Sequence, residues 1–315
     1  MTLSKRKASL FPRAGQVLAL CFLVSAPALA AEADSTAVLG MGGAGTANPW
    51  DANAVRRSPA AMQLVVQYTA RVDGRYGEGI AVGGTLQDTR TSNVGGALSY
   101  TRQWVSREPD SSELPGWLPP DQSEVVDERQ ENAYRLGLGT GFFRQTVVSS
   151  SGSYDVRRLA VGVGGVFERN TSSLVGVEQS FGLDASLAGR PTKSLVLAAT
   201  GHDLIPTSVR DPSVEAGLWW EPIEALGVAV DGAWDRSYAG VPLGGRAGVQ
   251  YLLSGVVPLR GGYALYGSGE DADQRLGLGV GVRNDVASID YAFTLHTVGP
   301  LAGWMEHSVG LWASF

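Results

Sequence analysis

The chain has 315 residues, of which 44% are hydrophobic, 18% are charged and 42 are glycine. Glycine at about twice its usual frequency, spread without a collagen repeat, argues against long helices, since each interior glycine costs a helix about 1 kcal/mol. Residues 1–30 carry four basic and no acidic side chains, which leaves 21 basic and 31 acidic side chains and a net charge of −10 in the rest. We expect no nucleic-acid partner, because phosphate binding needs a basic face.

Residues 1–30 have the pattern of a secretory signal peptide. Basic residues at 5–7 precede the apolar run 17–24, and Ala-Leu-Ala at 28–30 provides a small-x-small cleavage site. The run is too short to span a bilayer as a helix, which needs about 20 residues. The only cysteine, Cys21, lies inside this leader, so we expect an exported chain without a thiol. A lipoprotein anchor through Cys21 is the less favoured alternative.

From residue 63 onward, apolar residues alternate with small or polar ones over eight to ten positions. This period is typical of a strand whose two faces meet different environments. In one clear case, Leu276, Leu278 and Val280 alternate with glycines. The segments that follow the rule are fourteen in number: 63–72, 79–88, 93–104, 132–145, 156–168, 177–189, 194–203, 213–221, 225–236, 244–253, 257–267, 274–283, 286–297 and 306–315.

The connections between these segments alternate in length. One set is tight, at 88–93, 149–154, 190–193, 221–224, 254–257 and 284–285. The other set is on the whole longer and contains the insertion 105–131. An even number of strands of about ten residues, with short turns at one rim and longer loops at the other, indicates an all-β transmembrane antiparallel β-barrel. A soluble β-sandwich, the alternative, would carry a water-facing side richer in Lys, Glu, Thr and Ser than this glycine-rich and alanine-rich face.

The last segment carries Val309, Leu311, Ala313 and Phe315 on one face and stops on the aromatic residue. This pattern resembles the signal by which the barrel assembly machinery recognises outer-membrane barrels. We therefore predict an integral protein of the outer membrane of a Gram-negative bacterium. Its surroundings would be outer-membrane lipid and lipopolysaccharide, with the N-terminus in the periplasm.

Catalysis and cofactor binding find little support in the sequence. Residues 40–45 formally match the Gly-x-Gly-x-x-Gly dinucleotide fingerprint, but that motif needs the strand and helix of a βαβ unit around it. The three histidines are scattered and no nucleophile elbow occurs. The sequence also shows no His and carboxylate residues clustered at the spacings of the usual metal sites. We expect neither an enzyme nor a cofactor or metal site.

The residues before the first strand form a glycine-rich stretch at 38–47, an acidic and alanine-rich stretch at 51–55, and Ser-Pro-Ala at 58–60. They resemble the N-terminal plug of the outer-membrane long-chain fatty-acid transporter (FadL-like) superfamily, including its shorter PorV-type relatives. Residues 179–204 resemble a strand, turn and strand of the same family, with Asp203 where the family has Asn, just as Ser58 replaces an Asn.

The resemblance implies a barrel over residues 63–315 with a plug within residues 31–62. The plug has too few large apolar residues to form a core of its own. The residues that we assign to it are Gly42, Gly43, Gly45, Asp51, Arg56, Arg57, Ser58, Pro59 and Ala60.

Placing the non-aliphatic strand positions in the lumen puts five arginines and five carboxylates there: Arg71, Arg135, Arg246, Arg260, Arg283, Glu168, Asp184, Glu215, Asp231 and Asp290. The charges cancel, which argues against a strongly ion-selective pore. Paired charges that brace the wall and the plug explain these residues better than contacts with a cargo, since buried ionic groups need partners. The alternative is a polar lining that contacts a cargo or gates the plug, with Arg56 and Arg57 as ligands of lumen carboxylates.

The insertion 105–131 holds eight acidic and two basic side chains and four prolines. A stretch of this composition cannot bury a core, and we expect an extracellular loop. The default interpretation is a solvated loop. The alternatives are carboxylates that bind divalent cations bridging to lipopolysaccharide, or residues 114–118 contacting a partner.

Two functions remain open. The resemblance implies that the barrel passes hydrophobic small molecules across the outer membrane. The alternative is a non-transporting barrel that serves as anchor or adaptor of an envelope machine, for secretion or surface motility. With one long loop, and that one acidic, the sequence holds the two nearly level, and transport is ahead only through the resemblance.

Overall fold

The computed structural model describes residues 34–51, 54–77, 79–107, 127–149, 152–173, 176–205, 211–236, 241–269, 272–299 and 302–315. The predicted signal peptide and residues 108–126 of the acidic loop lie outside these ranges. Helical turns in the described part are α2 (Thr36–Leu39), α3 (Ala54–Arg57) and the 3₁₀ helix η1 (Ala61–Leu64). No helix among the described residues is long and apolar enough to cross a membrane.

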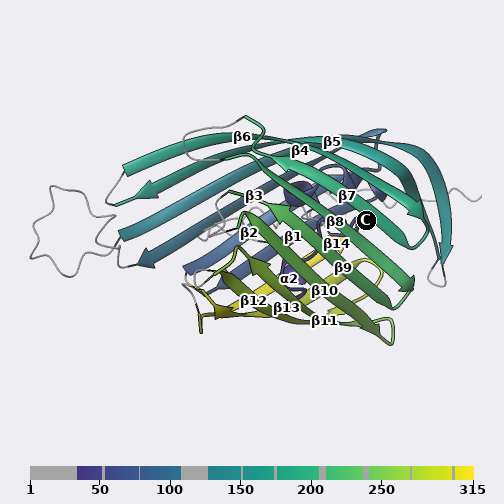
Figure 1. The fold of residues 1–315 in the computed structure, drawn as a ribbon. Helices are drawn as coiled ribbons and strands as arrows, with labels where there is room; N and C mark the ends of the chain where they lie inside the picture. The colour runs from purple at the N-terminus through teal and green to yellow at the C-terminus, as the bar shows by residue number, and fades with distance from the viewer. Residues whose placement is uncertain are drawn as a thin grey trace, which may run out of the picture.

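Fourteen strands form one closed barrel, in which each strand pairs antiparallel with its neighbours in sequence and β1 pairs with β14 (Figure 1). The strands are β1 (Tyr68–Tyr76), β2 (Gly79–Asp88), β3 (Val94–Arg107), β4 (Asp127–Ser149), β5 (Gly152–Ser172), β6 (Gly176–Thr192), β7 (Leu195–His202), β8 (Ser213–Ile223), β9 (Leu226–Trp234), β10 (Leu243–Leu253), β11 (Val257–Tyr266), β12 (Asp273–Arg283), β13 (Ala287–Val298) and β14 (Met305–Ser314). The predicted fourteen-stranded barrel is confirmed.

The outer face of the wall is apolar and the inner face carries small and polar residues. On β12, Leu276, Leu278 and Val280 are exposed on the outside, and the alternating glycines point inward. An aromatic row crosses β3, β4 and β5 on the outside, with Tyr100 and Tyr134 ring centroids 4.8 Å apart and Phe167 following at 6.2 Å from Tyr134. Such rows mark the level where a barrel meets the lipid headgroups.

The two rims differ as the sequence predicts. Connections at one rim, here called the tight-turn rim, are short, such as 193–194 between β6 and β7 and 224–225 between β8 and β9. The opposite long-loop rim includes the connection from β3 to β4 at 108–126. The C-terminal residue lies at the tight-turn rim, where the Phe315 N–H donates a hydrogen bond to the Tyr68 carbonyl oxygen at 3.0 Å.

The structure corrects the predicted bounds of the insertion 105–131. β3 continues to Arg107 and β4 begins at Asp127, and these two residues are partners in the ladder. The ends of the predicted loop are therefore strand, because the two flanking segments pair with each other beyond the level of the neighbouring strands. Together with β5 and β6, they make one side of the wall much longer than the rest (Figure 1).

The predicted start of the first strand at residue 63 is also wrong. Residues 61–64 form η1, and β1 begins at Tyr68. Gln63 and Leu64 are both fully buried. The physical reason is that Leu64 and Val65 are consecutive apolar residues that are both buried inside the barrel. They do not alternate between a lumen face and a lipid face.

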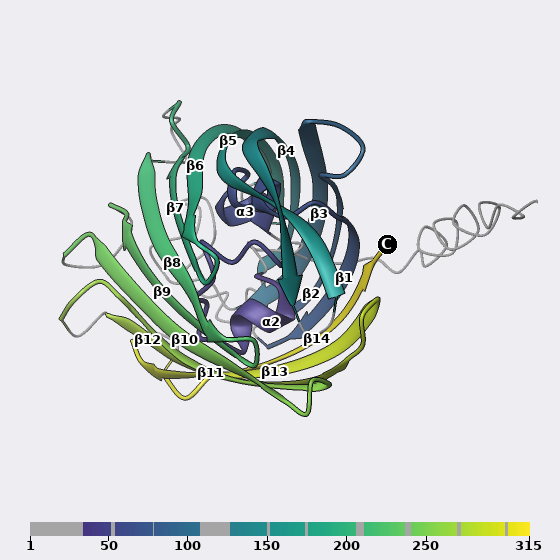
Figure 2. The same cartoon turned by 90° about the vertical axis from the view of Figure 1, so that its right-hand side faces the viewer.

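Residues 34–51 and 54–65, here called the inner segment, lie inside the barrel (Figure 2). α2 packs against β12, β13 and β14, α3 packs against β3 and β4, and η1 packs against β4, β5 and β6. The inner segment therefore contacts opposite sides of the wall.

Candidate functional site

Local turns hold the inner segment in a compact form. The Ser35 hydroxyl accepts a hydrogen bond from the Val38 N–H at 3.2 Å, which caps α2, and donates one to the Asp51 carboxylate at 2.7 Å. After α2, Gly42 and Gly43 adopt φ angles of 65° and 84°, a left-handed conformation that favours glycine. The chain thereby turns back towards α2 and lies against the wall.

Inward-facing glycines of β10, β11 and β12 form a seat for the turn that follows α2. A Cβ atom at Gly262 would lie 2.0 Å from the Met41 carbonyl oxygen, and one at Gly248 would lie 2.5 Å from the same atom. A Cβ atom at Gly277 would lie 2.3 Å from the Leu39 carbonyl oxygen. Backbone thus packs directly on backbone in this β10–β12 seat, and no residue with a side chain fits there without a shift.

A second seat lies across the lumen on β4 and β5. A Cβ atom at Gly162 would lie 2.6 Å from the Ala60 nitrogen and from the Pro59 carbonyl carbon. One at Gly137 would lie 2.5 Å from the Val55 Cγ2 atom. This β4–β5 seat receives the chain between α3 and η1.

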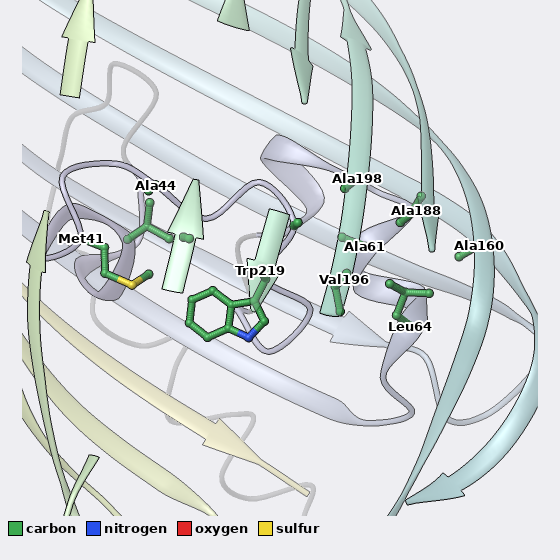
Figure 3. Close-up of a cluster of buried hydrophobic side chains, with 13 residues drawn as sticks. Met41, Ala44, Ala61, Leu64, Ala160, Ala188, Val196, Ala198 and Trp219 are labelled. Carbon is green, nitrogen blue, oxygen red and sulfur yellow. The ribbon is translucent and has the colours of Figure 1, made fainter. Parts of the chain in front are cut away.

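The larger of two apolar clusters that the inner segment shares with the wall is shown in Figure 3. Trp219 of β8 is 2% exposed and lies on the inner face, surrounded by small side chains of the wall and apolar side chains of the inner segment. The cluster consists of Val38, Met41, Ala44, Ala47, Ala60, Ala61, Leu64, Ala160, Ala188, Val196, Ala198, Trp219 and Ala229. The inner segment has few large apolar residues, and it buries them against the barrel instead of against itself.

Arg57 of α3 connects the beginning of the inner segment to the wall. Its guanidinium contacts the Asp34 carboxylate at 2.5 Å and the Glu215 carboxylate of β8 at 2.9 Å. Burial by itself would lower the pKa of Arg57, but the two carboxylates outweigh it and raise that pKa well above its ordinary value. Arg57 therefore stays charged, and its buried charge is balanced by Asp34 of the inner segment and Glu215 of the wall.

Glu215 and Asp231 both face Arg246 of β10 and form ion pairs with it, the Asp231 pair at 3.7 Å. The Asp231 carboxylate also accepts hydrogen bonds from the N–H groups of Gly45 and Thr46 at 2.7 and 3.1 Å, and the Thr46 hydroxyl donates to Glu215. With Arg57 and Asp34, these residues form the β8–β10 ionic cluster. It joins neighbouring wall strands to two separate parts of the inner segment.

A second ionic cluster surrounds Arg71 of β1. The Arg71 guanidinium lies 2.8 Å from Asp73, 3.8 Å from Asp51 of the inner segment and 3.9 Å from Asp290 of β13. Asp290 also pairs with Arg260 at 2.6 Å. The first residue of α2 donates to Asp73 from its N–H at 2.8 Å and from its hydroxyl at 2.7 Å. This β1 ionic cluster holds the opposite side of the inner segment.

All ten charged residues assigned to the lumen occupy inner-face positions of their strands, and eight of them belong to ion pairs. The pair outside the two clusters joins Arg135 of β4 to Asp184 of β6 at 3.5 Å. Of the other two, Glu168 accepts a hydrogen bond from Ser180 at 3.4 Å, and Arg283 is partly buried at the tight-turn end of β12.

The residues assigned to the plug all lie in the inner segment, with Arg57 partly buried and the others buried: Gly42, Gly43, Gly45, Asp51, Arg56, Ser58, Pro59 and Ala60. Arg57 reaches a lumen carboxylate, as described. Arg56 donates to the hydroxyl of Ser99 on β3 at 3.2 and 3.1 Å. The Ser58 hydroxyl accepts a hydrogen bond from the Ala61 N–H at 3.2 Å at the start of η1.

Asp203 follows β7 with a φ angle of 51°. Asp and Asn are among the few residues with a side chain that adopt this left-handed conformation readily. The Asp203 N–H donates to the Asp184 carboxylate at 3.1 Å, and a Cβ atom at Gly182 would lie 2.0 Å from the Asp203 side-chain oxygen. The residue therefore packs against β6 where that strand extends past the end of β7.

Several residues of the site escaped the sequence-based assignment. Asp73 stands two positions after Arg71 and shares its inward phase, so the alternation could have identified it. Asp34 gave no such signal. The alternation placed glycines such as Gly277 on the inner face, but it could not show which of them receive the inner segment, because that depends on the distant residues that they meet. Among the described residues, no group of three or more His, Cys, Asp or Glu side chains is placed to hold a metal ion.

The arrangement keeps the lumen occupied by the protein's own N-terminal residues. Displacing the inner segment would separate Arg57 and Asp51 from their partners on the wall and uncover the apolar surface around Trp219. The same lumen would then present a wall of glycine, alanine and mutually paired charges.

The sequence matches no protein-family model and no curated protein. The fold does match solved structures. The chain is similar to the P. putida toluene transporter TodX with a TM-score of 0.61 at 11% identity, over 90% of this chain and 99% of that chain. The Ralstonia pickettii toluene transporter TbuX gives a TM-score of 0.60 at 12% identity, over 90% and 97% of the two chains.

A Pseudomonas aeruginosa FadL homologue gives a TM-score of 0.59 at 12% identity, over 92% of this chain and 99% of the homologue. At these identities the likeness concerns the fold. The barrel thus has the fold of the FadL-type outer-membrane channels, which is the fold that the N-terminal residues and residues 179–204 pointed to.

Proposed function

We propose that this chain, which has the fold of FadL-type channels, is an outer-membrane barrel that passes hydrophobic small molecules across that membrane. The observation that carries the proposal is the likeness of the whole fold to solved toluene transporters, over 90% of the chain. The inner segment acts as the plug of the channel, and transport requires it to move.

The chemistry of the lumen supports this function over an ion pore. Eight of the ten lumen charges form ion pairs with one another or with the inner segment, and the described inner face shows no ring of charges of one sign. Trp219 and the small residues around it offer an apolar surface once the inner segment withdraws. A hydrophobic molecule gains by burial against such a surface.

Outer-membrane insertion follows from the same proposal, with the tight-turn rim and the N-terminus on the periplasmic side. A cysteine at Ala302, on the long-loop rim, is expected to react with a membrane-impermeant maleimide on whole cells. A cysteine at Thr192, on the tight-turn rim, is expected to react only after the cells are broken. The reverse labelling pattern would invert the proposed orientation.

The decisive experiment removes residues 38–57 and keeps the leader, η1 and the barrel. We expect an assembled barrel, recognised by its changed gel mobility on boiling, with much larger conductance in planar bilayers than the full chain. Unchanged conductance would mean that the inner segment does not occlude the lumen. Conductance of the full chain, purified in parallel, is the reference.

Uptake distinguishes transport from the adaptor alternative. Loss of the gene is expected to slow uptake of hydrophobic substrates such as a radiolabelled aromatic hydrocarbon or long-chain fatty acid, and the full chain is expected to restore it. If uptake is indifferent to loss of the gene while secretion or surface motility fails, the adaptor function replaces the proposal.

A further inference from the structure

The hairpin that joins β4 to β5 extends past the tight-turn rim and does not continue the line of the barrel wall (Figures 1 and 2). We call its described residues, 143–149 and 152–158, the strap. β3 pairs with β4 only up to Thr140, and β6 pairs with β5 only from Leu159. The strap is therefore a two-stranded ribbon without neighbours in the barrel ladder.

The strap bends where it leaves the wall. Phe143 adopts a φ angle of 58°, a strained conformation for a bulky residue. On the facing strand, Ala160 is buried in the wall and Arg157 is buried in the strap, while Arg158 and Leu159 between them are both exposed. The alternation of inward and outward residues changes phase at this point, so the ribbon turns the Arg157 face towards the lumen.

The β5 edge of the strap and the Arg157 side chain bind the end of the inner segment. Val156 forms an antiparallel bridge with Val65, and the Val66 N–H donates to the Asp155 carbonyl oxygen at 3.2 Å. The Arg157 guanidinium donates to the backbone carbonyl and the side-chain oxygen of Gln63, both at 3.2 Å. The strap thereby covers the residues that connect η1 to β1.

Arg157 also ties the strap to the rim. It donates to the carbonyl oxygens of Thr89 and Ser92, in the connection from β2 to β3, both at 3.1 Å. These four hydrogen bonds of Arg157 end on neutral oxygens, unlike the contacts of Arg57 and Arg71 with carboxylates. A guanidinium held by carbonyl groups can be released without leaving an unpaired carboxylate behind.

The far side of the strap reaches a different part of the rim. The Tyr154 ring meets the Trp50 ring of the inner segment edge-on, with centroids 5.1 Å apart. Trp50 donates from Nε1 to Glu221 of β8 at 3.1 Å, and the Arg190 guanidinium of β6 lies 6.0 Å from the Trp50 ring centroid. The pKa of the Tyr154 hydroxyl is raised, first by partial burial and then by the nearby Glu221 carboxylate.

We propose that the strap is a latch that retains the inner segment, hinged at Phe143 and closed by Arg157 and by the Trp50–Tyr154 contact. The inner segment is enclosed between the two glycine seats and the strap, which crosses its exit at the tight-turn rim. The latch must swing away from the rim before the inner segment can leave its seats. This inference deepens the proposed function and rests on it for its role in transport, but the motion itself is independent of any cargo.

A reversible cross-link tests the latch. Val65 and Val156 are partners across an antiparallel bridge, where Cα atoms lie about 4.5–5.5 Å apart, within the range of a disulfide. The full chain is expected to show discrete opening steps in planar bilayers as the latch releases the inner segment, and their absence would itself overturn the latch. The double variant V65C/V156C, oxidised after assembly, is expected to lose these steps and to regain them on reduction. A V228C/V249C variant, which links β9 to β10 within the wall, is the matched control and is expected to open in both redox states.

Equal opening of V65C/V156C in its oxidised and reduced states, with the disulfide verified on non-reducing gels, would overturn the latch. Gel mobility before and after boiling checks that each variant is assembled. These bilayer measurements need no cargo, so they stand apart from the uptake experiments of the proposed function.

Distance measurements provide the second arm. Spin labels at T146C on the strap and E224C on the β8–β9 turn are expected to report two populations of distances in the assembled barrel. Adding R157Q, which removes the hydrogen bonds to Gln63, Thr89 and Ser92, is expected to shift the labels towards the longer distance. A single distance that R157Q leaves unchanged would contradict the hinge. If the labels report two distance populations but loss of the gene does not change uptake of hydrophobic substrates, the latch is supported and transport is not its purpose.

Discussion

The inner segment is held to the barrel in two physically different ways. In the glycine seats, backbone meets backbone, and the contact exists because a Cβ atom is missing at Gly262 and Gly162. In the ionic clusters, long side chains such as Arg57 and Arg71 span the space between segment and wall. Seats set the position of the segment because close packing tolerates little change. Ionic contacts mainly decide how much it costs to leave that position, because each lost partner strands a buried charge.

The largest expected effect comes from filling a seat. Gly262→Ala places a Cβ atom 2.0 Å from the Met41 carbonyl oxygen, and backbone on both sides prevents an easy shift. We expect a loss of about 3 kcal/mol in the free energy of unfolding, the upper range for overpacking, measured by denaturant titration of the barrel in lipid vesicles. Bilayer conductance is expected to rise, because the inner segment is displaced.

Gly261→Ala is the matched control for this seat. Gly261 is the adjacent residue of β11, and its Cβ atom would find its nearest neighbour, Leu278 Cδ2, at 3.9 Å, which is ordinary contact. We expect stability and conductance close to those of the parent chain. Equal losses in the two variants would mean that glycine is needed for the strand and not for the seat.

A smaller effect is expected from the β8–β10 ionic cluster. Glu215→Gln keeps the shape and removes the charge that Arg57 and Arg246 share. We expect a loss of about 2 kcal/mol, since both guanidinium groups retain one carboxylate each. Salt is expected to change this loss little, because the cluster is buried. Glu178→Gln on the exposed end of β6 is the control, and a loss there as large as at Glu215 would argue against the cluster.

The smallest effect concerns the local turn between α3 and η1. Ser58→Ala removes the hydroxyl that accepts the Ala61 N–H, and we expect a cost of about 1 kcal/mol, as for the loss of a helix cap. The seats and ionic clusters remain, so conductance is expected to stay at the parent level. An increase in conductance with this variant would mean that the local turn helps to position the inner segment in the lumen.

The sequence predicted much of the barrel because the wall repeats one simple rule. On β12, Leu276, Leu278 and Val280 face outward and glycines face inward, and period-2 alternation identifies such a strand wherever lumen and lipid differ. The rule failed at residues 63–65, which are consecutively buried inside the barrel, and at Arg157, where the ribbon bends and the phase changes. The same alternation predicted that the ten lumen charges face inward, but it did not predict which of them pair with one another.

The sequence by itself determined the fold class, the number of strands, the contrast between the rims and which strand residues face inward. These properties arise from neighbours in sequence and from the two solvents on either side of the wall. Only the tertiary structure decided that Arg57 meets Asp34 and Glu215, that Gly262 receives Met41, and that the strap closes over Val65. Such contacts join residues far apart in sequence, so they depend on how the closed barrel brings distant strands around one segment.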